Sequence, residues 1–288
     1  MKHRFRISGA ILVCALLWSS SHAVPARAAD DAVITADKAL VTAFEKGDNS
    51  ALKKYLDPDF SWIDTDGVMT SGSDALALGM KPKLGEGNDV QVREFKIGDN
   101  IIWLHLNSGN IYVGRVWVKR ASGWKLLHTT EIMKHGRDEE INVRPAFAIP
   151  CVNPCQTVPF HPVDKIQAEV LKQWQEQVSS REQLIRHTDD DQVMVTTYDG
   201  ETPPRKVRLT GPGQPSSGPA IGSPPVLWMR MWTIDPQTVV MLACHPSYGG
   251  KAYWSSRAFH FQNGLWQMME SYHNTIQQGP VMTEVQGK

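Results

Sequence analysis

Three titratable side chains in the first half of the chain, Asp64, His105 and His128, are the candidates for acid–base chemistry. A carboxylate in an apolar pocket can become a general base, whereas an aspartate in a turn only caps that turn. His105 follows Trp103 on an apolar run, where a histidine either serves a pocket or is hydrogen-bonded within the sheet. The residue types leave both interpretations open at each position.

Two arginines recur at one spacing relative to a tryptophan. Arg115 precedes Trp124 by the same number of residues as Arg257 precedes Trp266. Each arginine could bind a carboxylate through a bidentate fork, or could pair with an acidic residue across strands. The matched spacing predicts that the two arginines occupy equivalent places in two copies of one structure.

His128 and Glu270 are matched in the same way, because each follows its tryptophan at an equal distance. Strict alternation along a strand places His128 on the face of Trp124 and Glu131 on the opposite face. Matched polar residues could line a pocket in each copy, or could be solvated near a sheet edge. The side chains that we expect to bind a ligand are Trp62, Trp103, Arg115, Trp124, Glu131, Arg257 and Glu270.

The repeat extends to the turns and helices, since Asp66-Gly67 and Asp199-Gly200 each follow a β-rich run that follows a helical one. A repeat this long indicates two copies of a domain rather than a solenoid. We expect a signal peptide over residues 1–28 and a first domain over 29–136. A proline-rich linker over 137–162 should lead to a second domain over 163–276, followed by a tail over 277–288.

Hydrophobic periodicity and glycine turns predict the elements of each copy. In the first copy we expect helices over 32–46 and 51–56, a strand over 60–64, a short helix capped by Ser73, and strands over 89–97, 101–107, 111–120 and 124–133. In the second we expect helices over 163–180 and 181–187, a strand over 192–198, an irregular stretch over 205–219 in place of the small helix, and strands over 226–234, 239–245, 251–261 and 265–273.

The stretch Asp57-Pro58-Asp59-Phe60-Ser61-Trp62-Ile63-Asp64-Thr65-Asp66-Gly67-Val68, with the later Gly-Trp-Lys-Leu-Leu-His run that ends at His128, resembles the nuclear transport factor 2-like superfamily. It is most similar to SnoaL-like and ketosteroid isomerase-like domains. The resemblance implies an α+β fold of two tandem cone (cystatin-like) domains, each with helices packed on a curved antiparallel sheet around a pocket. Fold alone does not imply an activity.

The resemblance also assigns a place to Asp64. In ketosteroid isomerases an aspartate at the end of the first strand is the general base, and Asp64 matches it; we place Thr197 at that position in the second copy. Those enzymes carry a tyrosine on the first helix, where this chain has Leu40 and Val41. Any such chemistry is therefore expected in the first domain.

The N-terminus has a basic start, an apolar run over 11–18 and small residues before Ala23 and Ala28. This pattern is typical of a cleaved secretory signal peptide and predicts a secreted or periplasmic protein. In an oxidising compartment Cys151 and Cys155 could form a local disulfide, or remain thiols because the ring would be short.

The 30 basic and 30 acidic residues cancel and form no basic stripe, which argues against nucleic acid as a partner. The sequence shows no motif for a phosphate, metal or nucleophile site, so we expect no cofactor. We expect a small organic ligand in an apolar cone pocket. The alternatives are a cofactor-free acid–base enzyme (isomerase, dehydratase or lyase type) in the first domain, and a structural or assembly role. The sequence does not give the oligomeric state, and a homodimer through sheet faces is one possible arrangement.

Overall fold

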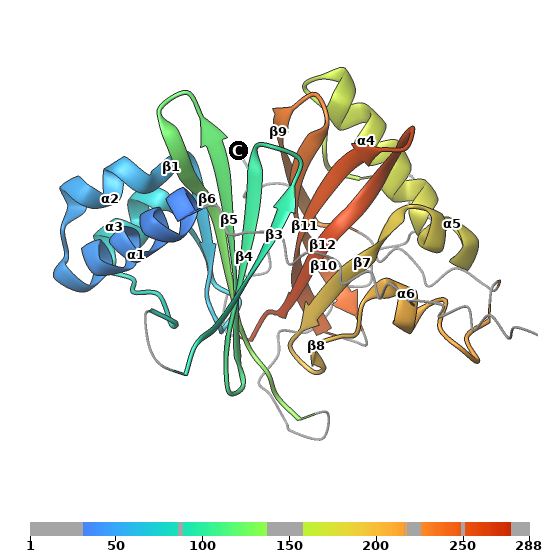
Figure 1. Cartoon of the computed structure of the whole chain (residues 1–288), viewed down its shortest axis with the longest axis horizontal. Coiled ribbons are helices and arrows are strands. Elements are labelled where there is room, and N and C mark those ends of the chain that lie inside the picture. Colours follow the sequence, from blue (N-terminus) through green and yellow to red (C-terminus); the bar gives the residue numbers. More distant parts are fainter. Residues whose placement is uncertain are drawn as a thin grey trace, which may run out of the picture.

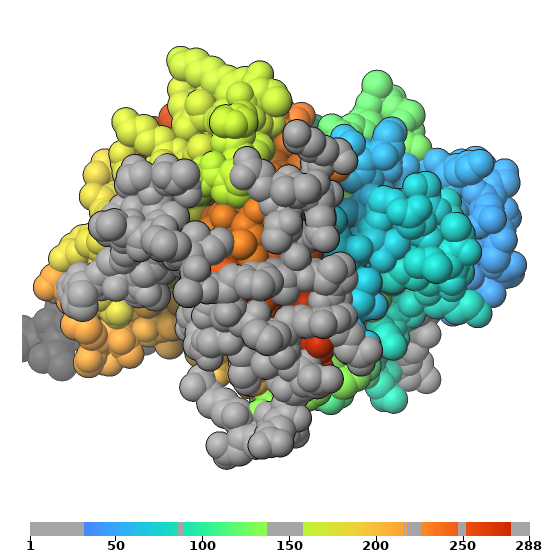
Figure 2. Space-filling model, turned by 180° about the vertical axis from the view of Figure 1, so that it is seen from behind, coloured from blue at the N-terminus to red at the C-terminus, as the bar shows by residue number. Residues whose placement is uncertain are grey.

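The computed structural model describes residues 31–85, 89–136, 158–215, 217, 226–248 and 251–277. The predicted signal peptide, Cys151 and Cys155 lie outside these residues, as do most of the predicted linker and tail. No helix within the described ranges is long and apolar enough to cross a membrane. The described chain forms two domains with a sheet each, and their helices lie on the two outer sides of the molecule (Figures 1 and 2).

Domain 1 is an α+β unit built on one six-stranded sheet. Its elements are α1 (Asp31–Lys46), α2 (Asn49–Tyr55), β1 (Leu56–Ile63), β2 (Met69–Ser71), α3 (Gly72–Ala77), β3 (Gln91–Ile97), β4 (Ile101–Ser108), β5 (Ile111–Arg120) and β6 (Gly123–Met133). The strand order is β2-β1-β6-β5-β4-β3. Strand β1 runs parallel to β6, and all other neighbours in this sheet are antiparallel.

Domain 2 repeats this topology. Its elements are α4 (Lys165–Gln177), α5 (Arg181–Arg186), β7 (Thr188–Thr196), β8 (Gly200–Glu201), α6 (Arg205–Arg208), β9 (Trp228–Asp235), β10 (Thr238–Tyr248), β11 (Lys251–Gln262) and β12 (Leu265–Thr275). Its strand order, β8-β7-β12-β11-β10-β9, is the order of domain 1. Two tandem α+β cone domains, as the sequence predicts, are therefore present.

Local signals fix most element ends. Gly47, at φ +65°, ends α1, and the Asp48 side chain accepts hydrogen bonds from the first backbone N–H groups of α2. Two predictions were wrong. Ser71, not Ser73, caps α3, because the Ser71 Oγ accepts from the backbone N–H of Asp74. The second copy also keeps a small helix, α6, where we predicted an irregular stretch.

A β-bulge at the same place in β6 and β12 reverses the side-chain alternation. Val116 pairs with His128 but Trp117 pairs with Leu126, so Leu127 is the extra residue. In domain 2 the extra residue is Met269. Beyond each bulge the residues change faces. Strict alternation was therefore the wrong expectation: His128 faces the other domain and Glu131 faces its own helices.

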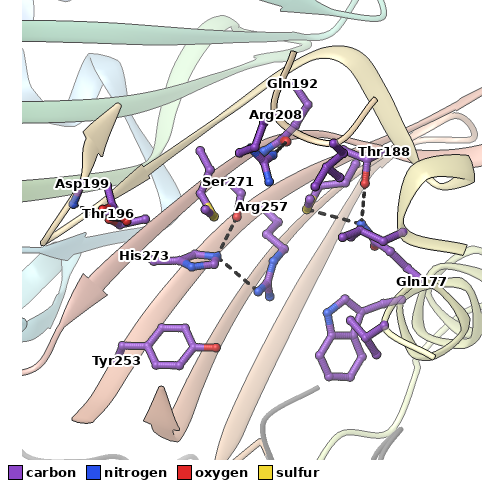
Figure 3. Close-up of a pocket in the computed structure, with 16 residues that line it drawn as sticks. Gln177, Thr188, Gln192, Thr196, Asp199, Arg208, Tyr253, Arg257, Ser271 and His273 are labelled. Atoms are coloured by element: carbon purple, nitrogen blue, oxygen red, sulfur yellow. Dashed lines mark hydrogen bonds between the residues drawn. The ribbon is translucent and has the colours of Figure 1, made fainter. Parts of the chain in front are cut away.

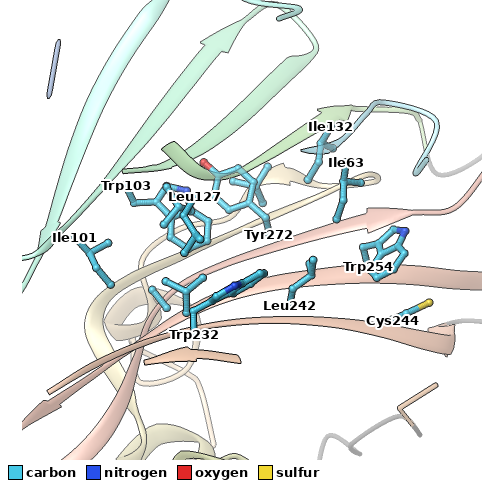
Figure 4. Close-up of a cluster of buried hydrophobic side chains, with 14 of the residues drawn as sticks. Ile63, Ile101, Trp103, Leu127, Ile132, Trp232, Leu242, Cys244, Trp254 and Tyr272 are labelled. Atoms are coloured by element: carbon cyan, nitrogen blue, oxygen red, sulfur yellow. The ribbon is translucent and has the colours of Figure 1, made fainter. Parts of the chain in front are cut away.

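The two sheets pack face to face and share one apolar core. Trp103 stacks on Tyr272 at 5.2 Å between ring centroids, and Leu127, Trp232 and Leu242 pack around them (Figure 4). The sheet faces through which a homodimer could form are thus buried against each other within one chain. A homodimer through those faces would have to displace this contact.

Candidate ligand-binding site

Domain 2 contains a cavity of about 240 Å³ between its helices and the sheet face that these helices cover, which is turned away from domain 1 (Figures 1 and 3). Much of its wall is apolar and comes from α4, α5, β7, β12 and the residues after α4 and α6. These apolar side chains are Trp174, Val178, Leu184, Met194, Leu209 and Met268. Polar groups of β11 and β12 gather at one part of the wall: Tyr253, Arg257, Ser271 and His273.

Arg257 is the central charge of this polar group and is 7% exposed. Its guanidinium donates to Ser255 Oγ at 2.7 Å and lies 3.4 Å from His273 Nε2. Burial lowers the pKa of Arg257, and the neighbouring Tyr253 opposes this shift. Within the described ranges no carboxylate pairs with Arg257, and its partners there are neutral groups.

His273 completes the polar group. Its Nε2 atom is hydrogen-bonded to Ser271 Oγ at 2.9 Å. Burial, followed by the charge of Arg257, holds the pKa of His273 well below its usual range. His245 lies beside Tyr253 on the neighbouring strand β10, with ring centroids 4.6 Å apart, and its Nε2 is hydrogen-bonded to Ser255 Oγ. The imidazole of His273 is neutral at physiological pH.

The matched arginine of domain 1 has a different environment. Arg115 is 1% exposed and pairs with Asp37 of α1 at 2.5 Å. The Trp117 indole N–H donates to the other oxygen of Asp37. On α4 the buried residues follow the spacing of α1, and a neutral side chain, Gln167, takes the place of Asp37 in that pattern. One arginine is thus neutralised by its own domain and the other is not.

The three predicted catalytic residues do not converge. Asp64 Oδ1 accepts from the backbone N–H groups of Asp66 and Val68 and so caps the β1–β2 turn; burial raises its pKa. His105 lies on β4, which β5 and β6 separate from β1, and faces domain 2, where it is 3.1 Å from Glu201. Thr196, rather than Thr197, is the residue of domain 2 at the position equivalent to Asp64, because Ile63 pairs with Thr130 as Val195 pairs with Tyr272.

His128 and Glu270 are equivalent, as predicted, but both face the interdomain core rather than a pocket. His128 is hydrogen-bonded to Ser61 of its own sheet and to Ser256 of domain 2, and burial lowers its pKa to about 3. Glu270 is 1% exposed, and burial raises its pKa well above the usual range. Trp103 lies in the same interdomain core.

Four predicted ligand-binding residues, Trp62, Trp124, Arg115 and Glu131, line the interior of domain 1. Of the seven predicted ligand-binding residues, Arg257 alone lines the cavity of domain 2. Sequence reasoning missed His273, Ser271 and Tyr253. The sequence does contain a signal for His273, because it occupies the position in the second copy that Glu131 occupies in the first. The bulge hides that both residues lie on the helix-covered face of their sheets.

No family model and no curated protein matches the chain. Solved structures match it over one domain's length. An NTF2-like protein from Cytophaga hutchinsonii is 18% identical, covering 36% of this chain and 96% of its own, with a TM-score of 0.30. A ketosteroid isomerase-like protein from Erwinia carotovora atroseptica is 14% identical, covering 36% and 94%, with a TM-score of 0.29. The CaMKII hub of S. rosetta is 21% identical, covering 37% and 98%, with a TM-score of 0.29. Each of these three similarities spans about one domain's length of the chain, and the tandem arrangement itself comes from the repeated strand order.

Proposed function

We propose that domain 2 binds a small organic anion, most simply a carboxylate, with Arg257 as its charged contact. The observation that carries this proposal is a buried guanidinium whose protein partners, within the described ranges, are the neutral Ser255, His273 and Tyr253. Burying a charge without an opposite charge is costly. A ligand carboxylate that pairs with the guanidinium of Arg257 would supply the opposite charge and form charge-assisted hydrogen bonds with it.

The remainder of the cavity supports a ligand with an apolar body. Trp174, Leu184 and Met268 supply apolar surface, while Ser271 lies beside the arginine as a further hydrogen-bonding group. Arg208, a second guanidinium in the wall, donates to Gln192 Oε1 at 2.8 Å. A volume of about 240 Å³ is below the range of about 300–1,000 Å³ typical of drug-sized ligands, which favours a small acid.

The histidine that lines the cavity favours binding over proton transfer. A general base works best when its pKa lies near the working pH. Burial and the adjacent Arg257 hold the pKa of His273 far below that value, so the imidazole is a weak base. In domain 1, Asp64 serves the turn while His105 and His128 face the interdomain core, and this arrangement gives the acid–base alternative no shared pocket.

Calorimetric titration with benzoate and its neutral isostere benzamide tests the proposal. Because hydrogen bonds to charged groups contribute about 1.5–3 kcal/mol, we expect benzoate to bind about tenfold to a hundredfold more tightly than benzamide. Arg257→Gln should abolish this preference. The matched control is Arg186→Gln, the same change at an exposed arginine of α5 in the same domain. Equal affinities for the two probes in the wild type would refute an anion site.

We also propose that the chain is exported and loses its N-terminal segment. The support is the basic start, the apolar run and the small residues before Ala23 and Ala28. Mass spectrometry of protein from the native host should find a mature start at Val24 or Ala29. Protein that retains Met1 in the cytoplasm would contradict export.

A further inference from the structure

A short segment after α3 enters the interior of domain 1. Leu84 of this segment is 6% exposed and packs in the core between the helices and the sheet. Its carbonyl oxygen accepts a hydrogen bond from Arg115, and the backbone N–H of Lys83 donates to Glu131 Oε1 at 2.9 Å. A Cβ at Gly85 would lie 3.0 Å from Val41 of α1, so the backbone approaches that helix closely. We call residues 81–85 the strap.

The strap occupies, in domain 1, the place that the cavity occupies in domain 2. Arg115 and Glu131 correspond, through the shared register and the shared bulge, to Arg257 and His273. In domain 2 these positions line an open cavity. In domain 1 the same two positions are bonded to two separate backbone groups of the strap, the Leu84 carbonyl and the Lys83 N–H, which supply one acceptor and one donor.

One more buried polar atom faces this interior without a hydrogen-bond partner among the described residues. It is Thr129 Oγ1, in a side chain that is 2% exposed. Trp62, which packs against Phe44 of α1, has the Glu131 carboxyl as the neighbour of its indole N–H, and Thr129 lies on the Glu131 side of β6. Buried polar atoms are normally paired, so the Thr129 hydroxyl indicates a site with room for one more polar contact than the strap makes.

We propose that domain 1 contains a second, latent binding site, closed by the strap, for a small molecule that carries a carboxamide. A carboxamide has one carbonyl acceptor for Arg115 and N–H donors for Glu131, which are the two kinds of group that the strap supplies. A carboxylate is disfavoured there because Asp37 already pairs with Arg115 and Glu131 is a second acid. This proposal is independent of the anion site, since it uses no residue of domain 2.

Titration of Glu131 supports a strap that can open. Burial raises the pKa of Glu131 to about 7, against the opposing effects of the Lys83 N–H and Arg115. The charged groups around it are Arg115 from β5, Asp37 from α1 behind that arginine, and Lys83 from the strap. With the strap closed, Glu131 holds its proton up to about pH 7, whereas a solvated glutamate loses it near pH 4.5. This difference stabilises the closed form fully below pH 4.5 and no longer above about pH 7. Opening should therefore increase from about pH 4.5 to about pH 7 and then level off.

Hydrogen exchange on the full chain tests the opening. After correction for the intrinsic rate, the Lys83 amide should exchange at least about tenfold more readily at pH 8 than at pH 5. Glu131→Gln, which cannot ionise, should remove this difference. A corrected exchange rate for Lys83 that is the same at both pH values in the wild type would overturn the pH-dependent strap.

Binding of benzamide tests the latent site itself. Leu84→Ala removes the apolar anchor of the strap and leaves its backbone bonds, so benzamide affinity should increase about tenfold or more. Benzoate affinity, which reports domain 2, should stay unchanged and shows that the variant is folded. The matched control is Leu78→Ala, because Leu78 lies between α3 and the strap and is 72% exposed. Wild-type benzamide affinity in Leu84→Ala, with benzoate binding intact, would overturn the latent site while leaving the anion site standing.

Discussion

At the scale of single residues, the two matched arginines show how one neighbour decides what a side chain does. Arg115 and Arg257 occupy the same position on equivalent strands and are both buried. Asp37 neutralises the first, whereas neutral groups surround the second. The sequence predicted the match and left open whether either arginine pairs internally. The spacing could not settle this, because Asp37 comes from a helix far away along the chain.

Opposite effects on stability follow for one substitution at these two positions. Arg115→Met leaves Asp37 buried without its counter-charge, so we expect the free energy of unfolding to fall by about 3–5 kcal/mol. Arg257→Met removes a buried charge that has no acidic partner among the described residues, so stability should stay the same or increase. Urea unfolding of both variants measures the difference. A loss at Arg257 as large as that at Arg115 would mean that Arg257 is already compensated within the protein.

His128 should make the fold sensitive to acid. Its pKa is about 3 in the folded protein, because of burial, against 6.5 for an ordinary histidine. The unfolded chain therefore binds a proton first, and this residue costs stability as the pH falls from 6.5 toward 3, at about 1.4 kcal/mol per pH unit. Above pH 6.5 it contributes no pH dependence. His128→Gln should flatten the decline in unfolding free energy between pH 6 and pH 4, compared with wild type in urea titrations; an unchanged slope would show that His128 does not cause it.

At the scale of elements, periodicity and glycine turns predicted most strands, and the bulges account for the main error. Strand β5 begins and ends as predicted, and the second domain has the predicted order of helices and strands. Leu127 and Met269 carry no local signal of a bulge, since either would fit a regular strand. The bulges arise from pairing with β5 and β11, which is tertiary. This one feature moved His128 and Glu270 from a predicted pocket into the interdomain core.

At the scale of the whole molecule, the repeat gives each domain a covered sheet face. Hydrogen bonds cross this contact as well as apolar groups: the Asn274 side chain donates to the carbonyl oxygens of Asp64 and Glu131, and the Trp254 indole to that of Gly67. The sequence predicted two domains but not their contact within one chain, since either sheet face could equally have met a second copy. The interior of domain 1 is filled by Leu84 and by the ion pair of Asp37 with Arg115, whereas domain 2 contains a cavity at the equivalent place.

Two substitutions of Tyr272, at the centre of the interdomain core, should distinguish the contribution of its ring to stability from that of its hydroxyl. Its ring stacks on Trp103, and its buried hydroxyl forms no hydrogen bond of good geometry with the described residues, only a weak contact with the Trp103 side chain. Tyr272→Phe should therefore leave stability unchanged or raise it, because no buried hydroxyl remains to be desolvated. Tyr272→Ala should lower the free energy of unfolding by about 3–5 kcal/mol through the cavity it creates. Equal losses in the two variants would contradict this view of the contact.

The most direct test of the central claim is a crystal structure of the protein with bound benzoate. The account predicts the carboxylate in the cavity of domain 2, with an oxygen about 2.7–2.9 Å from the guanidinium of Arg257. The aromatic ring should lie against Trp174 and Met268. A carboxylate bound elsewhere on the chain, or an empty cavity with Arg257 still bonded to Ser255 and His273 alone at saturating benzoate, would contradict it.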